Sequence, residues 1–115
     1  MYLPEFSRIN RERSEATNGF NHKLEHWSLS DWFTATMGEL DEAANIAKKL
    51  NRVRDGISGN TETEGELRIK LADELADTFI YLDLMSQSAG IDLSQAVRDK
   101  FNKTSAKIGY PHAFI

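Results

Sequence analysis

Residues 67–85 read Leu-Arg-Ile-Lys-Leu-Ala-Asp-Glu-Leu-Ala-Asp-Thr-Phe-Ile-Tyr-Leu-Asp-Leu-Met, and this stretch is the strongest indication of the fold class. Its apolar side chains cover most of a helical circumference, and no glycine or proline interrupts it. A helix with this pattern is usually surrounded by other helices, so the stretch predicts the central helix of an all-α protein. Three short neighbouring helices would not cover it fully, which also predicts self-association.

Two pairs of acidic residues accompany this stretch, each with members three positions apart. Glu74 and Asp77 lie inside it, and Glu39 and Glu42 lie upstream. Because an i,i+3 spacing places both members on the same side of a helix, two packed helices can direct all four carboxylates at one point. Carboxylate oxygens suit Mg²⁺ or Mn²⁺. Alone, the upstream pair is better explained as a solvated helix face, but the apolar setting of the downstream pair favours a metal site. Lys70, four residues before Glu74, is a candidate partner that cannot neutralise four acids.

The segments before this stretch predict two further helices. Pro4 suits the first turn of a helix that Asn18-Gly19 ends, and residues 20–27 form an irregular approach with a turn of helix. Ser30 is the expected N-cap of a second helix, which begins at Asp31 and lasts to about Arg54. Apolar residues fall on one stripe of this second helix: Phe33, Met37, Leu40, Ala44 and Ala47.

Residues 55–65 are polar and rich in glycine, which predicts a connector. Thr63 and Glu66 form a capping box that starts the central helix, and Gly90 ends it. Asp92 caps a fourth helix that stops near Gly109. The whole chain, residues 1–115, is therefore expected to form a single helical domain.

Composition excludes several classes of protein. A net charge of −4 and a pI near 5.3 argue against duplex nucleic acid as the main partner. The absence of cysteine excludes disulfides and thiolate zinc sites. The first residues lack the pattern of a secretory signal, and no run of 18 apolar residues occurs. We therefore expect a soluble, cytoplasmic protein that has no membrane partner.

The kind of metal chemistry can be narrowed further. None of the three histidines follows a glutamate by three residues, which disfavours a ferritin-like di-iron site, and no phosphate-binding P-loop motif is present. All-carboxylate Mg²⁺ sites typically act on phosphate substrates. The fourth helix carries four basic residues that could bind phosphate oxygens: Arg98, Lys100, Lys103 and Lys107. For Lys107, a position on a solvated helix face is the simpler explanation.

The chain resembles the MazG-like all-α nucleoside triphosphate pyrophosphohydrolases from about Ile9 onward. The segments that carry the resemblance are 27–28 and 31–32, 37–43 (Met-Gly-Glu-Leu-Asp-Glu-Ala), 74–82 (Glu-Leu-Ala-Asp-Thr-Phe-Ile-Tyr-Leu), 100–103 (Lys-Phe-Asn-Lys) and 109–111 (Gly-Tyr-Pro). The resemblance implies a four- to five-helix bundle, assembled as a dimer or a dimer of dimers with sites between subunits. The first helix and the apolar tail Phe114-Ile115 are expected to contribute to subunit contacts.

The same resemblance implies hydrolysis of a nucleoside or deoxynucleoside triphosphate to the monophosphate and pyrophosphate. Glu39, Glu42, Glu74 and Asp77 would bind Mg²⁺, with Mn²⁺ as a substitute. Either Glu39 or Glu42 would accept the proton of the attacking water, and the residues do not favour one over the other.

Further residues are implied as substrate contacts by the resemblance. Lys100, Asn102 and Lys103 would contact the triphosphate, and Tyr81 would lie near the sugar. Trp27 or Trp32 would stack on the base, although packing in the core is the preferred role of Trp32. His26 would bind the base or cap a turn. The competing functions are a non-catalytic module that binds a nucleotide or metal, and a helical oligomerisation domain.

Overall fold

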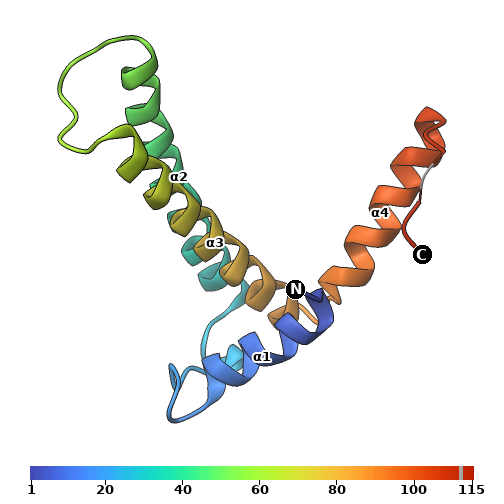
Figure 1. Cartoon of the computed structure of the whole chain (residues 1–115). Coiled ribbons are helices and arrows are strands. Elements are labelled where there is room, and N and C mark those ends of the chain that lie inside the picture. Colours follow the sequence, from blue (N-terminus) through green and yellow to red (C-terminus); the bar gives the residue numbers. More distant parts are fainter. Residues whose placement is uncertain (112) are drawn as a thin grey trace. The chain divides into compact units, whose positions relative to one another are not determined.

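The computed structural model describes residues 1–111 and 113–115, so His112 lies outside the described residues. Within these ranges all regular structure is helical, which confirms the all-α prediction. None of these helices has the length and apolar composition needed to cross a bilayer. In chain order the elements are α1 (Leu3–Glu15), the 3-10 helix η1 (Leu24–His26), α2 (Leu29–Arg54), α3 (Glu64–Ser88) and α4 (Leu93–Ile108) (Figure 1).

The contacts divide the chain into two compact units. The first, which we call the hairpin unit, is Trp27–Leu82 and contains α2 and most of α3. The second, which we call the α1/α4 unit, contains Met1–His26 and Asp83–Ile115. The helix α3 runs from one unit into the other.

In the α1/α4 unit, α1 begins at the predicted proline but ends at Glu15, before the expected stop at Asn18-Gly19, with Ala16 as its C-cap. Pro4 lies in the first turn, where its missing N–H costs no hydrogen bond. After the helix ends, the chain folds back closely, and the Phe20 N–H donates to the carbonyl of Arg13 at 3.0 Å. A Cβ atom on Gly19 would lie 2.1 Å from that carbonyl oxygen, so only glycine fits this turn.

In the hairpin unit, α2 begins at Leu29, two residues earlier than predicted. Ser28, rather than Ser30, is the N-cap of α2, because its hydroxyl accepts the Asp31 N–H at 3.2 Å. The Asp31 carboxylate in turn accepts the Ser28 N–H at 2.9 Å, which completes a capping box. The predicted end of α2 at Arg54 is confirmed.

The connector between α2 and α3 is held against both helices. The Asn60 side chain donates to the Lys49 carbonyl at 2.8 Å, and the Glu62 carboxylate lies 3.1 Å from Lys49 Nζ. Lys70 of α3, a candidate partner of Glu74, instead lies 3.5 Å from the Glu62 carboxylate. Thr63 accepts the Glu66 N–H at 3.1 Å, which confirms it as the cap of α3.

In the hairpin unit, α2 and α3 lie side by side, and their contact surface buries only part of the apolar surface (Figure 1). Trp32, Ala43 and Leu67 are buried there. The predicted stripe of α2 lies beside this contact surface and is largely exposed, with Phe33 at 51% and Met37 at 61%. One partner helix covers only part of an apolar arc this wide, so much of the stripe that the periodicity predicted stays exposed in the single chain.

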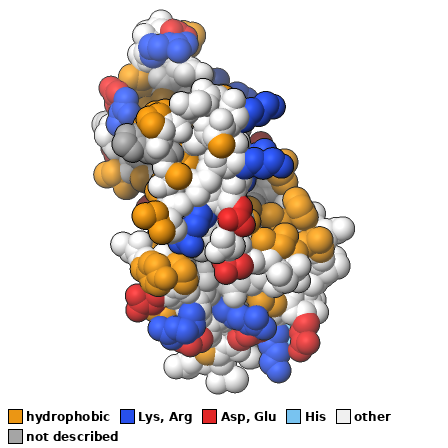
Figure 2. Space-filling model, turned by 90° about the vertical axis from the view of Figure 1, so that its right-hand side faces the viewer, with side chains coloured by type: hydrophobic (Ala, Val, Ile, Leu, Met, Phe, Trp, Pro, Cys, Tyr) orange, Lys and Arg blue, Asp and Glu red, His pale blue; other side chains and the backbone are white. Residues whose placement is uncertain are grey.

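In the single chain, α3 also keeps exposed apolar residues, in line with the prediction that its neighbours would not cover it fully. Ile69 and Leu75 are exposed on α3, as are Ala72 and Ala76. Hydrophobic side chains are also visible among charged ones on the face shown in Figure 2. Both helices of the hairpin therefore carry apolar surface that the chain itself does not cover.

The limits of α4 follow the prediction. The Asp92 carboxylate accepts the Gln95 N–H at 3.1 Å, and Gly109 ends the helix with a φ of 77°. Gly90, with a φ of 71°, provides the left-handed residue after α3.

Candidate metal centre

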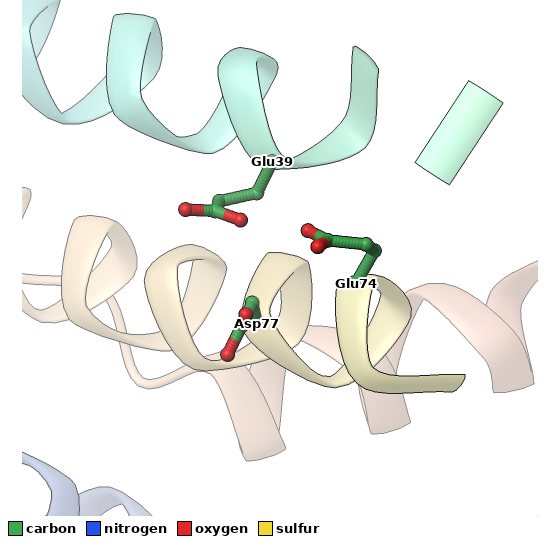
Figure 3. A group of neighbouring side chains, drawn as sticks. All are labelled: Glu39, Glu74 and Asp77. Atoms are coloured by element: carbon green, nitrogen blue, oxygen red, sulfur yellow. The ribbon is translucent and has the colours of Figure 1, made fainter. Parts of the chain in front are cut away.

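Three of the predicted acids meet between α2 and α3 of the hairpin unit. Glu39 of α2 and Glu74 and Asp77 of α3 each offer a carboxylate oxygen, and these oxygens lie within 4.8 Å of one another. Figure 3 shows the Glu39 and Glu74 carboxylates pointing toward each other across the gap between the helices. The i,i+3 spacing on α3 places Asp77 one turn along from Glu74, as predicted.

Water reaches this cluster unevenly. Glu39 and Glu74 are half-buried, whereas Asp77 is exposed, so the apolar surroundings expected for both acids of α3 enclose only one of them. The Oε2 atom of Glu74 is buried and has no hydrogen-bond partner among the described residues. A buried carboxylate oxygen without a donor is costly, and a proton or a cation would relieve that cost.

The repulsion within the cluster shifts two pKa values. Contact with the Glu42 carboxylate, followed by the loss of surrounding water, raises the pKa of Glu74 to about 7, and Glu39 adds to the shift. Burial raises the pKa of Glu39, and the charges of Glu42 and Asp77 act in the same direction, although contact with Glu74 opposes them. These directions are typical of carboxylates that share one site without a counter-charge.

Glu42, the fourth predicted ligand, lies at the edge of the cluster. Its side chain is exposed, and it is not among the three acids whose oxygens converge. Its carboxylate nevertheless affects the pKa of both Glu39 and Glu74. The structure therefore brings the four predicted acids into one region, with three of them at the centre.

An aromatic cluster adjoins the acids. The ring of Trp32 lies 4.7 Å from that of Trp27 and 6.3 Å from that of Tyr81, measured between centroids. Burial raises the pKa of Tyr81, and the charges of Glu39 and Asp77 raise it further, so its hydroxyl lies within the field of the acids. Trp32 is 1% exposed, which confirms packing in the core, and Trp27 is half-buried beside it.

The remaining predicted substrate contacts belong to the α1/α4 unit. Lys100 and Lys103 are exposed on α4. The Asn102 amide is bound to the backbone of Phe114, donating to its carbonyl at 2.6 Å and accepting its N–H at 2.8 Å. His26 accepts the Lys23 N–H at 3.2 Å, which is the turn-capping role among the two expected for it.

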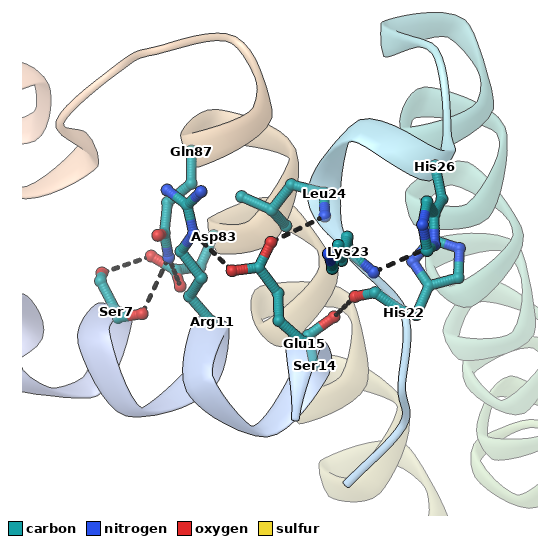
Figure 4. Close-up of polar contacts among 10 residues, drawn as sticks. All are labelled: Ser7, Arg11, Ser14, Glu15, His22, Lys23, Leu24, His26, Asp83 and Gln87. Atoms are coloured by element: carbon teal, nitrogen blue, oxygen red, sulfur yellow. Dashed lines mark hydrogen bonds and ion pairs between the residues drawn. The ribbon is translucent and has the colours of Figure 1, made fainter. Parts of the chain in front are cut away.

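A second polar centre, in the α1/α4 unit, was not predicted. Asp83 of α3 is 0% exposed, and its carboxylate accepts hydrogen bonds from the Ser7 hydroxyl and, at 3.0 Å each, from the Asn10 and Gln87 amides. The Gln87 amide also donates to the Ser7 carbonyl at 2.9 Å. Figure 4 shows Asp83 and Gln87 facing Ser7 of α1. The sequence signal was a lone acid within the apolar run 82–85.

The chain matches no protein-family model, no curated protein and no solved structure.

Proposed function

We propose that this protein is a Mg²⁺-dependent pyrophosphohydrolase that converts a nucleoside or deoxynucleoside triphosphate to the monophosphate and pyrophosphate. One observation carries the proposal. Acids from two helices, spaced as the resemblance to the MazG-like enzymes requires, converge on one point with a buried, unpartnered oxygen of Glu74 among them. Among the described residues, no lysine or arginine side chain forms an ion pair with Glu39, Glu74 or Asp77. A positive charge from outside the chain would therefore stabilise the cluster.

The donor set fits a hard divalent cation. It consists of carboxylate oxygens alone, which Mg²⁺ prefers and Mn²⁺ accepts. Mg²⁺ is usually held by one or two carboxylates together with water and substrate phosphates, and the exposed Asp77 leaves one side of the cluster accessible to both. Glu39, Glu74 and Asp77 would hold the ion, and Glu42 would complete the set.

The chain's own residues have distinct roles in this proposal. A bound cation supplies positive charge next to the phosphates and makes a nearby water more acidic. Glu39 or Glu42 accepts the proton of the water whose oxygen attacks the α-phosphorus, while the bond from that phosphorus to the bridging oxygen breaks and pyrophosphate leaves. Tyr81 and Trp27, whose rings both lie against Trp32 beside the acids, offer contacts to the nucleoside.

Self-association belongs to the same proposal. The exposed stripe of α2 and the exposed apolar residues of α3 lie in one unit, and a second copy of the chain would cover them. A homodimer, or a dimer of dimers, is the assembly that the resemblance implies.

Turnover of a substrate panel tests the enzymatic function. The protein is incubated with ribo- and deoxyribonucleoside triphosphates, with and without Mg²⁺, and pyrophosphate is measured. We expect release only with the metal, and a fall of at least about hundredfold in Glu74→Gln and Glu42→Gln, because each removes a charge from the cluster. Asp73→Asn is the matched control, since it removes an exposed charge from the same helix next to Glu74.

Other outcomes would favour other functions. If Mg²⁺ or a nucleotide raises the melting temperature of the protein but no pyrophosphate is released, the protein is a binding module and not an enzyme. If the melting temperature does not change and no pyrophosphate is released, an oligomerisation domain is the remaining function. Equal activity in Glu74→Gln and in the wild type would exclude the acid cluster as the site.

A further inference from the structure

A group of three charged side chains lies at the connector end of the hairpin unit, the unit that also contains the acid cluster. Glu62 of the connector lies between Lys49 of α2 and Lys70 of α3. The Nζ atoms of the two lysines are 3.1 and 3.5 Å from the same atom, Glu62 Oε2. We call these three residues the Glu62 clamp.

Lys70 has two acids within its reach. It precedes Glu74 by four positions on α3, and residues at this spacing lie on the same side of a helix, one turn apart. In the structure its ammonium group pairs with Glu62, and no ion pair joins it to Glu74 within the described part of the chain. The acid cluster therefore lacks the lysine that the sequence places next to it.

We propose that Glu62 is a positioning residue, which holds Lys70 away from Glu74 and so keeps the acid cluster open for a cation. This role rests on the proposed function, which places Mg²⁺ at the cluster. An ammonium group on Glu74 would repel a divalent ion and would occupy an oxygen that the ion uses as a ligand.

Glu62 is a stronger partner for Lys70 than Glu74 is. Its side chain is only 12% exposed, and the Thr61 hydroxyl also donates to it at 2.9 Å. Hydrogen bonds from Lys49 and then from Thr61 lower the pKa of Glu62 to about 2, so this carboxylate stays charged at neutral pH. A pair in which lysine precedes glutamate by four positions is the weaker of the two possible orders on a helix.

Removing the charge of Glu62 would release Lys70 toward the cluster. Lys49 and Lys70 pair with one oxygen, so without its charge the two ammonium groups repel each other. Glu74 lies one turn further along the same side of α3, and its buried Oε2 atom has no hydrogen-bond partner in the described structure. Lys70 would find an acceptor there.

Mn²⁺ binding, measured by EPR spectroscopy of the free ion, tests this role. We expect the Kd of Glu62→Gln to be about tenfold above the wild-type value, the effect of one positive charge brought next to a divalent ion. The double variant Glu62→Gln/Lys70→Gln should return to the wild-type Kd or below it, which a merely structural role of Glu62 would not produce. Glu64→Gln is the matched control, because it removes a charge that pairs with Arg68 near the start of α3.

Thermal melting in EDTA at pH 8 gives a readout that needs neither metal nor turnover. In the wild-type background, Glu74→Gln should raise the melting temperature, because it ends the repulsion among the acids. In the Glu62→Gln background the rise should be smaller, because Lys70 already offsets that repulsion. The full rise should return when Lys70→Gln is added.

The outcomes separate this role from the proposed function. If Glu62→Gln keeps the wild-type Kd, or if the weaker binding persists in the double variant, the role of Glu62 is overturned while the metal centre stands. An equal rise in melting temperature with and without Glu62 also overturns it. A wild type that binds no Mn²⁺ overturns the proposed metal centre, and the role of Glu62 in keeping it open is overturned as well.

Discussion

The pKa of Glu74 links the candidate site to the stability of the chain. It lies at about 7 in the folded protein against 4.5 for an ordinary glutamate. Between these values the folded chain holds a proton that the unfolded chain has released, so the folded state loses stability as the pH rises. We expect the free energy of unfolding of the metal-free protein to fall between pH 5 and about pH 8, as measured by urea denaturation in EDTA.

Glu74→Gln removes the titrating group and should flatten this slope. It should also raise the stability of the metal-free protein at pH 8, because an amide in this position ends the repulsion from Glu39 and Glu42. Asp73→Asn, on the exposed side of α3, should keep the wild-type slope. A Glu74→Gln protein that is less stable than the wild type at pH 8 would contradict the picture of crowded carboxylates.

Asp83 should be the polar residue whose loss costs most stability. Its carboxylate accepts three hydrogen bonds in a fully buried position, and Asp83→Ala would remove this acceptor from Ser7, Asn10 and Gln87 at once. We expect a loss of about 3 kcal/mol in the free energy of unfolding, measured by chemical denaturation. Asp83→Asn keeps an acceptor and should cost less, and Asp99→Asn, exposed on α4, should stay within about 0.5 kcal/mol. An Asp83→Ala protein of wild-type stability would show that the three bonds add nothing net.

At the level of single helices, Ser28 and Ser30 are both possible N-caps of α2 in the sequence, and we expect them to differ in their contribution to stability. Ser28→Ala removes the acceptor of the Asp31 N–H and should destabilise the protein by about 1 kcal/mol. Ser30→Ala lies inside the first turn and should change the stability by less than about 0.5 kcal/mol. Thermal melting measures the stability of the two variants. A larger loss of stability in Ser30→Ala than in Ser28→Ala would show that Ser30 is the N-cap, as predicted from the sequence.

Features that depend on residues close together in the sequence could be predicted, whereas features that depend on distant residues could not. Helix limits depend on signals a few residues apart, such as Thr63 with Glu66 or Asp92 with Gln95, and these were predictable. The acid pairs were predictable for the same reason, because their spacing is local. Asp83 bonds to Ser7 and Asn10, which lie 76 and 73 positions away, and no local pattern reports such a pairing. Periodicity likewise predicted the apolar arc of α2 but not which part of it α3 covers.

At the scale of the whole molecule, the uncovered arc of the hairpin predicts how the chain assembles. Phe33, Met37 and Leu40 are exposed along one stripe of α2 in the single chain. In a symmetric dimer a substitution occurs twice at the interface, so its effect on assembly is doubled. Placing a charge there should cost several kcal/mol, because each copy loses a buried aromatic ring and gains an unpaired carboxylate.

We therefore expect Phe33→Glu to raise the dissociation constant of the wild-type oligomer by at least about hundredfold, measured by analytical ultracentrifugation over a range of concentrations. Asn45→Glu adds the same charge to an exposed position of α2 outside the stripe and should leave the assembly intact. Both variants should keep the helical content of the wild type, because position 33 lies outside the buried contact between α2 and α3. A wild type that is monomeric at all concentrations would contradict self-association through this stripe.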